Sequence, residues 1–234
     1  MDEQPLNLPL VRSLVTDFIY RQITRAGFQR AVIGLSGGLD SGLACFLAAE
    51  ALGAQNVLAV RMPYRTSSPE SLEHAQMVID QLGVPSLTLP LTEMVDPYLE
   101  RFPGISDLRR GNILARQRMV VLFDQSAAFN GLVIGTGNKT EILLGYTTLY
   151  GDSACALLPL GVLYKTQVRQ LSREMGVPAV IIEKPPSADL WADQTDEGEL
   201  GFTYAEVDRL LTQLIDQQLT PAECVLAGFD QALV

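Results

Sequence analysis

The sequence predicts an α/β fold in which a five-stranded parallel sheet carries helices on both of its faces. Short apolar runs typical of buried strands alternate with longer stretches in which apolar residues recur at helical spacing. Several helical stretches end directly before a glycine, which is a favoured helix stop. Strands that alternate with helices in this way lie parallel and are joined by right-handed crossover connections.

The expected elements run from an amphipathic helix over residues 10–26 to a weakly helical tail over residues 221–234. The apolar runs predict strands over residues 31–35, 57–62, 86–89, 132–135 and 180–182. The helical spacing predicts helices over residues 39–52, 69–82, 108–129, 162–175 and 204–219. Residues 184–203 are rich in Pro, Asp, Gly and Gln, and a stretch of that length predicts an active-site loop.

The composition indicates one globular domain that works away from nucleic acids and membranes. The chain has 234 residues, of which 47% are hydrophobic, so it can bury one sizeable core. A formal net charge of −10 argues against nucleic acid as a partner, because binding to phosphate backbones requires clustered Lys and Arg. The sequence has no uncharged apolar run of the roughly 18 residues that a membrane span needs and no signal-peptide pattern. The three cysteines are far apart, which predicts neither a disulfide nor a zinc site and fits the reducing cytoplasm.

A glycine-rich turn between the first predicted strand and the following helix carries the strongest functional signal. It consists of Ser36-Gly37-Gly38-Leu39-Asp40-Ser41. The two glycines allow backbone N–H groups to converge on an anion, and the N-terminus of the helix adds a partial positive charge. The two serine hydroxyls can donate to phosphate oxygens. The turn therefore predicts a pyrophosphate-binding loop.

Asp40 in this turn has two explanations. Within an anion-binding loop a carboxylate repels phosphate unless a cation lies between them, so Asp40 is a candidate Mg²⁺ ligand that bridges protein and triphosphate. Alternatively, Ser-Gly-Gly is only a turn and Asp40 only a helix-starting residue, since Asp is favoured near helix N-termini. The residues alone leave both explanations open.

Two signatures identify a family resemblance. The turn is neither a Walker A loop nor a G-x-G-x-x-G fingerprint; it resembles the S-G-G-x-D-S signature of the N-type ATP pyrophosphatases, which have a Rossmann-like, adenine nucleotide alpha hydrolase-like fold. The segment Gly135-Thr136-Gly137-Asn138-Lys139-Thr140-Glu141 follows the fourth predicted strand and resembles the second signature of the NAD synthetases. Further matching blocks lie at residues 116–119, 144–146, 149–152, 163–166, 187–191 and 194–201.

The resemblance to ammonia-dependent NAD synthetases implies a set of site residues. ATP contacts are implied at Ser36, Gly37, Gly38, Asp40, Ser41, Arg61, Thr136, Lys165 and Ser187. Asp40 and Glu141 are implied to hold Mg²⁺ and, with Lys165, to be the catalytic groups. Arg116 on the long helix is implied to face the substrate deamido-NAD.

The same resemblance implies the reaction and its setting. ATP, deamido-NAD and ammonia are expected to give NAD, AMP and pyrophosphate through an adenylated intermediate, with Mg²⁺ as cofactor. The relatives are homodimers with the dinucleotide bound near the interface, so a homodimer is expected. We expect residues 1–234 to form a single domain without a glutaminase domain, because none of the three cysteines lies in an amidase context. Ammonia is then the nitrogen donor, either free or supplied by a separate protein.

Two alternatives to this function stay open. Leu149 and Ala156 stand where typical bacterial relatives have a Lys and an Asp that contact the dinucleotide. The protein could therefore be another ATP pyrophosphatase that adenylates a different acceptor, which profiling of ATP-to-AMP turnover across acceptors would reveal. It could also be a diverged, non-catalytic adenine-nucleotide-binding protein, which would bind ATP without releasing pyrophosphate.

Two side chains in helices are expected to be structural. His74 lies in a polar helical stretch next to Glu73 and has no obvious acidic or Cys partner in the sequence, so we expect it at the surface. Cys45 and Phe46 lie on the Ala/Leu-rich helix after the glycine-rich turn, where burial is expected.

Overall fold

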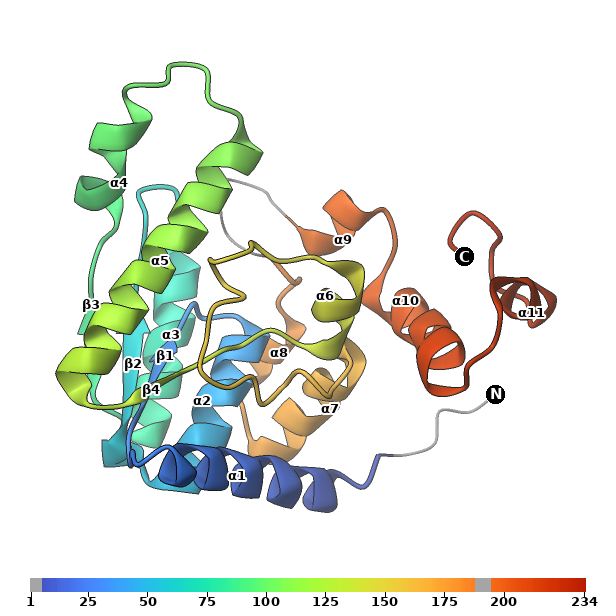
Figure 1. Cartoon of the computed structure of the whole chain (residues 1–234), viewed down its shortest axis with the longest axis horizontal. Helices are drawn as coiled ribbons and strands as arrows, with labels where there is room; N and C mark the ends of the chain where they lie inside the picture. The colour runs from blue at the N-terminus through green and yellow to red at the C-terminus, as the bar shows by residue number, and fades with distance from the viewer. Residues whose placement is uncertain (1–5, 188–194) are drawn as a thin grey trace.

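The computed structural model describes residues 6–187 and 195–234 and is built on a four-stranded parallel sheet (Figure 1). The order β3-β2-β1-β4 runs across the strands β1 (Ala31–Gly34), β2 (Val57–Arg61), β3 (Ser86–Thr88) and β4 (Leu132–Ile134). Ala31 of β1 lies opposite Val57 of β2 and Leu132 of β4. The chain therefore places β2 and β3 on one side of β1 and, later in the sequence, β4 on its other side. Open α/β sheets bind ligands at such a switch point.

The expected fifth strand over residues 180–182 is wrong. These residues belong to α8 (Ala179–Glu183), where Ile181 and Ile182 are buried. The place beside β4 is taken by Leu157, which forms a single parallel bridge with Ile134. A short apolar run of β-branched residues cannot be distinguished from one turn of a buried helix by its pattern alone.

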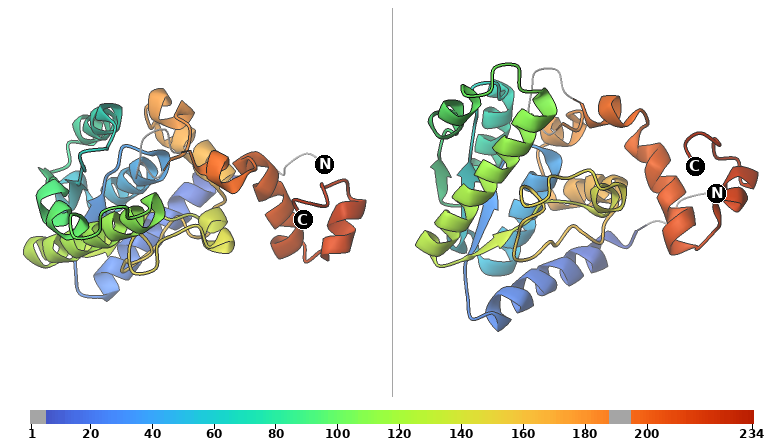
Figure 2. Two further views of the ribbon diagram at one scale, coloured as in Figure 1. Left: turned by 90° about the horizontal axis from the view of Figure 1, so that it is seen from above. Right: turned by 45° about the horizontal axis from the view of Figure 1, so that its top comes forward.

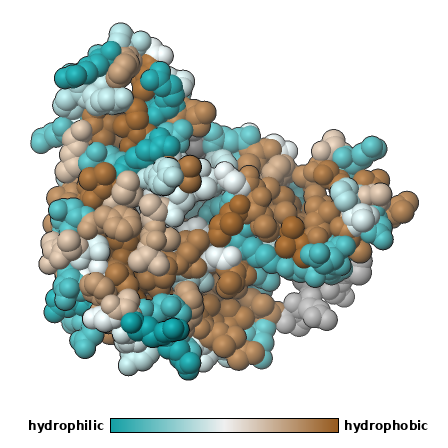
Figure 3. Space-filling model, in the orientation of Figure 1, coloured by the Kyte–Doolittle hydropathy of each residue, from teal (hydrophilic) through white to brown (hydrophobic). Residues whose placement is uncertain are grey.

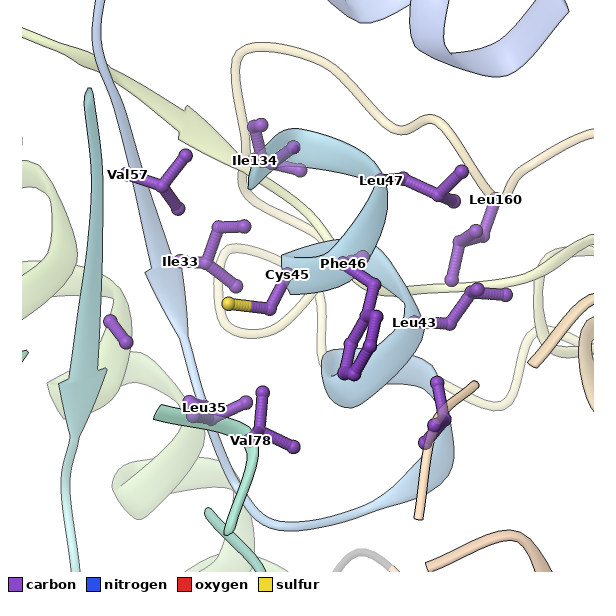
Figure 4. Packing of buried hydrophobic residues seen from close by; sticks show 14 of the residues in the cluster. Ile33, Leu35, Leu43, Cys45, Phe46, Leu47, Val57, Val78, Ile134 and Leu160 are labelled. Carbon is purple, nitrogen blue, oxygen red and sulfur yellow. The ribbon is translucent and has the colours of Figure 1, made fainter. Parts of the chain in front are cut away.

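One face of the sheet is covered by α1 (Leu8–Arg25), α2 (Leu39–Leu52), α3 (Pro69–Leu82) and α7 (Lys165–Met175). The central helix of this layer is α2, which is apolar on nearly all sides, as expected for a buried helix. Figure 4 shows Cys45 of α2 near Ile33 of β1, and Leu43 and Leu47 directed toward Leu160. The expected burial of Cys45 and Phe46 is confirmed.

The other face is covered by α4 (Thr92–Leu99) and α5 (Asp107–Phe129). Val95 of α4 and Leu114 of α5 pack in one cluster with Val32 and Val60 of the sheet. α4 was not expected from the sequence, because the helix is short and contains Pro97, a residue that usually breaks helices. Two further short elements are the 3₁₀ helix η1 (Ala54–Asn56) and α6 (Lys139–Leu144).

The C-terminal part of the chain forms four short helical elements. They are α9 (Asp196–Leu200), α10 (Tyr204–Leu211), the π-helical turn η2 (Thr212–Asp216) and α11 (Pro221–Leu226). The expected loop over residues 184–203 thus contains α9, and its residues 188–194 lie outside the described part. Tyr204 and Val207 of α10 pack on Tyr164, whereas α11 lies away from the sheet (Figure 2). Over the described ranges, no helix is both long enough and apolar enough to span a membrane.

His74 is buried, so its expected surface position is wrong. It is 2% exposed and lies on the inward face of α3 together with Ser71, Ala75 and Val78. These positions follow the spacing i, i+3, i+4 and i+7 of one helix face. Its Nε2 lies 3.7 Å from a Glu70 carboxylate oxygen. The surface position was expected because His74 lies in a polar stretch of the sequence, whereas Ser71 and Val78, three and four positions away, lie on the buried face.

Candidate active site

A cavity of about 1100 Å³ opens at the carboxyl edge of the sheet, beside the switch point between β1 and β4. Most of the residues predicted for the site line it, namely Ser36, Gly38, Asp40, Ser41, Arg61, Thr136, Glu141, Lys165 and Ser187. They come from the turn after β1, the end of β2, the segment after β4, α6, α7 and the segment after α8. Gly37 lies in the same turn but is buried beneath the cavity surface.

The turn after β1 is held in shape by its own serines and by α3. The Ser36 and Ser41 hydroxyl oxygens lie 3.0 Å apart, and the Ser41 hydroxyl donates to the Gly38 carbonyl at 3.0 Å. Gly37 has a φ of +82°, and a Cβ on it would lie 2.0 Å from the Ser71 carbonyl oxygen. Only glycine fits there, because both the backbone conformation and the space exclude a side chain. The turn leads into the N-terminus of α2, a favourable position for an anion.

Lys165 lies between two carboxylates at the floor of the cavity. Its Nζ donates to an Asp40 carboxylate oxygen at 2.5 Å and to a Glu141 carboxylate oxygen at 3.3 Å. The Lys165 side chain is 5% exposed, and those of Asp40 and Glu141 are 17% and 19% exposed. Three predicted catalytic residues from α2, α6 and α7 therefore meet in one cluster.

The charges in this cluster shift the proton affinities of its members. Burial and the neighbouring charge of Asp40 raise the pKa of Glu141 from 4.5 to about 7, although Lys165 opposes the shift. Burial alone would lower the pKa of Lys165, but the charges of Asp40 and Glu141 outweigh it and raise that pKa. Lys165 is therefore a permanent cation at neutral pH.

Asn138 connects the two carboxylates through a capping box at the start of α6. Its backbone N–H donates to a Glu141 carboxylate oxygen at 3.1 Å, and its side-chain oxygen accepts from the Glu141 N–H at 3.0 Å. Its side-chain amide donates to Asp40 at 3.0 Å. Asn138 is fully buried, so one residue orients both acids, the Glu141 carboxylate through its backbone N–H and the Asp40 carboxylate through its side chain. From the sequence, Asn138 was recognised only as part of a signature.

Arg61 enters the cavity from the end of β2. Its Nη1 donates to Gln76 at 2.6 Å, and the Gln76 amide in turn donates to Asp80 at 2.7 Å. The Arg61 Nε is buried and has no hydrogen-bond partner within the described residues. A buried donor without a partner is costly, so an acceptor for this N–H would stabilise the site.

A second group of polar residues at the cavity was missed by the sequence analysis. Asp196 is 5% exposed and accepts from the Tyr204 hydroxyl at 3.0 Å, while the Tyr146 hydroxyl bonds both Asp196 and Glu199. Burial and the charge of Asp40 raise the pKa of Asp196, although Lys165 opposes the shift. The ring of Tyr204 lies 5.0 Å from the Lys165 Nζ. Asp196 and Glu199 stood in a block that the family resemblance included, but no spacing rule pointed to them.

Two predicted positions, Arg116 and Ser187, lie at the margin of the described site. Arg116 does not line the cavity of the single chain; its side chain is exposed, and its Nε donates to the Leu149 carbonyl at 3.1 Å. Ser187 lines the cavity, but residues 188–191 and 194 of its matching block lie outside the described part of the chain.

Comparisons with known proteins agree on one family. A protein-family model described as NAD synthase matches residues 11–234. The chain is 58% identical to the NH(3)-dependent NAD(+) synthetase of Trichlorobacter lovleyi over 234 residues, which is 100% of this chain and 86% of that protein. It is 48% identical to the NH(3)-dependent NAD(+) synthetase of Fusobacterium nucleatum, covering 100% of this chain and 91% of that protein.

Solved structures of similar proteins confirm the predicted fold class. The NH3-dependent NAD synthetase from Campylobacter jejuni, in complex with the nitrate ion, matches with a TM-score of 0.82 and 32% identity, covering 97% of this chain and 90% of that chain. The NMN synthetase from Francisella tularensis matches with a TM-score of 0.84 and 33% identity, covering 88% of this chain and 87% of that chain. Sequence, fold and cavity thus agree, and the chain belongs to the NAD synthase family.

Proposed function

We propose that this protein is an ammonia-dependent NAD synthetase. It uses ATP to amidate deamido-NAD and releases NAD, AMP and pyrophosphate. The observation that carries the proposal is the cluster of Asp40, Glu141 and Lys165 at the switch point of the sheet, at the floor of a large cavity. This cluster provides a permanent cation and two carboxylates beside an anion-binding turn. Such groups can bind a nucleotide and stabilise the charge that develops when its phosphate is transferred.

Two carboxylates in the cluster fit a Mg²⁺ ion. Mg²⁺ prefers oxygen ligands and is typically held by one or two carboxylates together with phosphate oxygens. Asp40 and Glu141 offer such oxygens, and because burial and the charge of Asp40 raise the pKa of Glu141, a bound cation would favour its ionised form. When bound, the ion would neutralise charge on the triphosphate of ATP. Among the described residues no cluster of three or more metal-binding side chains occurs.

The protein's own residues align the reactants and neutralise developing charge. The turn Ser36–Ser41 and the N-terminus of α2 hold the β- and γ-phosphates. An oxygen of the deamido-NAD carboxylate attacks the α-phosphorus, the bond to pyrophosphate breaks, and an acyl-adenylate forms. Ammonia then attacks the acyl carbon, AMP leaves, and one proton is released. Lys165 lies where it can stabilise the negative charge that develops on the phosphate oxygens.

The remaining predicted contacts extend this site. We propose that Arg61, Thr136 and Ser187 contact ATP, because all three line the cavity and Arg61 keeps a buried N–H directed to no protein acceptor among the described residues. We propose that Arg116 contacts deamido-NAD, although it lies outside the cavity of one chain. Arg116 lies on α5, one turn before Val120, whose exposed side chain belongs to the surface that we propose for a second subunit.

We propose that residues 1–234 form one catalytic domain that associates as a homodimer. The family match spans residues 11–234 of this range. Exposed apolar side chains on α1, such as Leu14 and Phe18, and on α5, such as Val120 and Phe123, provide an apolar face for a second copy. The three free cysteines favour a reducing compartment such as the cytoplasm.

The experiment that tests the function is a product assay of the purified protein. With Mg²⁺, ATP, deamido-NAD and ammonium, we expect NAD and AMP in equal amounts. Asp40→Asn should abolish both products while the protein stays folded, and Asp230→Asn, a matched change near the C-terminus, should leave both unchanged. AMP without NAD would contradict deamido-NAD as the acceptor, and the absence of both products would contradict the activity.

A second acceptor is favoured by one finding. The Francisella tularensis protein with a TM-score of 0.84 is an NMN synthetase, so a mononucleotide acceptor is the second candidate. Comparison of kcat/KM for deamido-NAD and for the corresponding mononucleotide separates the two. We expect the dinucleotide to be preferred, because the curated relatives with 48% and 58% identity are NAD synthetases.

A further inference from the structure

A buried carboxylate on α10 lies outside the catalytic cluster. Asp208 is 3% exposed, and both of its carboxylate oxygens are bonded. One accepts from the Thr140 hydroxyl of α6 at 2.5 Å, and the other accepts from the Thr166 N–H, in the first turn of α7, at 2.8 Å. The aspartate therefore joins three helices at the point where α7 begins.

Thr140 connects this carboxylate to Lys165. The Thr140 hydroxyl oxygen accepts from the Lys165 backbone N–H at 2.9 Å, and Thr140 is fully buried. Because the single hydroxyl proton is donated to Asp208, a lone pair of the oxygen is left for the Lys165 N–H. Asp208 thus fixes the orientation of the Thr140 hydroxyl that accepts from the backbone N–H of Lys165. A carboxylate at the first turn of α7 also interacts favourably with the helix dipole.

The same helix contacts the other end of Lys165. The ring of Tyr204, in the first turn of α10, lies 5.0 Å from the Lys165 Nζ. The Nζ itself is fixed by Asp40 and Glu141. α10 therefore acts on Lys165 at its backbone through Asp208 and at its ammonium through Tyr204.

A purely structural role for Asp208 is the weaker explanation. Apolar residues pack α10 onto α7 at least as well, since burying an ionised group carries a desolvation penalty. In addition, Asp216 already links the same region, because it bonds Lys139 at 2.6 Å and the Tyr164 hydroxyl at 3.0 Å. Because Asp208 is not needed to attach α10, its buried carboxylate indicates that the geometry at the start of α7 has to be fixed.

We propose that Asp208 is a positioning residue that acts through Thr140 to hold Lys165 in its catalytic place. The proposal rests on the function proposed above, because it assumes that Lys165 stabilises charge during ATP cleavage. A small displacement of the Lys165 ammonium is enough to lower the rate of the chemical step. The binding of ATP depends on many other contacts and should change little.

The test compares kcat, KM and thermal stability for three substitutions. In Asp208→Asn only one oxygen remains to accept from two donors, and in Thr140→Val the hydroxyl is lost at nearly constant volume. We expect both to lower kcat by about 10- to 100-fold while the KM for ATP changes by less than about threefold. Thr140→Ser retains the hydroxyl and should restore kcat to near the wild-type value.

Asp216→Asn is the matched control, since it removes an acid that links α6 and α7 to the C-terminal segment without contacting Lys165. It should lower the melting temperature with little change in kcat. Wild-type kcat in both Asp208→Asn and Thr140→Val would overturn the proposal, as would an equal loss of kcat in Asp216→Asn. If Asp208→Asn does not fold, the Thr140→Val and Thr140→Ser pair decides alone. A wild-type protein that forms no AMP would instead contradict the proposed function.

Discussion

At the scale of single residues, the catalytic cluster contains a carboxylate, Glu141, that lowers the stability of the fold when it is ionised. Asp40 and Glu141 share one lysine in a largely buried cluster, and burial next to the charge of Asp40 raises the pKa of Glu141 to about 7. The folded protein without metal therefore ionises Glu141 only at a free-energy cost. A site designed for stability alone would contain one carboxylate for one ammonium, so the surplus carboxylate is a feature of function.

Glu141→Gln is expected to reveal this cost as a pH dependence of stability. Because the pKa in the fold exceeds the ordinary value of 4.5, the group contributes stability in full below 4.5, and this contribution is lost as the pH rises to about 7. Relative to Glu141→Gln, the wild type should lose up to about 3 kcal/mol of unfolding free energy across this window, at about 1.4 kcal/mol per pKa unit. Urea unfolding without Mg²⁺ between about pH 5 and about pH 8 measures the difference.

The control for this measurement is Glu223→Gln. Bonds from the Thr220 hydroxyl and N–H lower the pKa of the exposed Glu223 carboxyl, so its contribution is already complete above the ordinary pKa and should stay constant across the same window. A pH-independent difference between wild type and Glu141→Gln would show that Glu141 is not strained by its surroundings.

At the scale of elements, the unit β1, turn and α2 places the anion-binding groups. β1 ends at the switch point, Gly37 takes a conformation that other residues rarely adopt, and α2 begins directly after Gly38. The first turn of α3 lies directly behind Gly37 through the Ser71 carbonyl. The shape of the turn is therefore determined by packing between two helices as well as by its own hydrogen bonds.

Two glycine substitutions in this unit should have different effects. Gly37→Ala puts a Cβ 2.0 Å from a backbone oxygen at positive φ, so we expect a loss of about 2 kcal/mol or more in stability and of measurable ATP binding. In Gly42→Ala, the matched control inside α2, the new Cβ would meet only ordinary contacts from 3.7 Å, and the stability should stay equal or rise. Thermal unfolding and calorimetric titration with ATP and Mg²⁺ measure both. Wild-type ATP affinity in Gly37→Ala would contradict the role assigned to the turn.

The elements also indicate how far the sequence could predict the structure. α2 and α3 begin and end at the predicted residues, because a turn or a proline marks their starts and a glycine marks their ends. The fifth strand was wrong because its three β-branched residues also suit one turn of a buried helix. The cluster of Asp40, Glu141 and Lys165 was predicted only through a family signature, since no spacing rule brings residues so distant in sequence together.

Asp208 is a residue that the sequence could have indicated and that was missed. It lies on α10 at helical spacing from Tyr204 and Leu211, both buried, so a charged residue interrupts an apolar stripe. Such an interruption signals a buried carboxylate with partners. The identity of those partners, Thr140 and Thr166, depends on tertiary packing and could not be read from the pattern.

At the scale of the whole molecule, two helices present apolar side chains to the outside. Leu14 of α1 is 59% exposed and Val120 of α5 is 51% exposed. Both helices lie at the front of the molecule in Figure 1, and the space-filling view in Figure 3 shows extensive apolar surface on this face. An apolar face of this kind fits an isologous contact between two copies.

Val120→Glu is expected to convert the proposed dimer into a monomer. A charge placed in the centre of an apolar interface loses its hydration without gaining a partner, so association should weaken by at least about 100-fold. Sedimentation velocity measures the effect, and Met77→Glu on α3, with a 43% exposed side chain, is the matched control that should stay dimeric. A wild-type protein that sediments as a monomer, or a Val120→Glu variant that stays dimeric, would contradict this assignment of the interface.

We propose that the cluster at the switch point activates the carboxylate of deamido-NAD by promoting the transfer of AMP from ATP to it. The most direct test uses deamido-NAD labelled with ¹⁸O in its carboxylate, with Mg²⁺, ATP and ammonium, and analyses AMP and pyrophosphate by mass spectrometry. If the carboxylate attacks the α-phosphorus, one labelled oxygen stays on the phosphate when ammonia displaces AMP, so each AMP should carry one ¹⁸O and pyrophosphate none. Unlabelled AMP, or ADP as the product, would contradict the account.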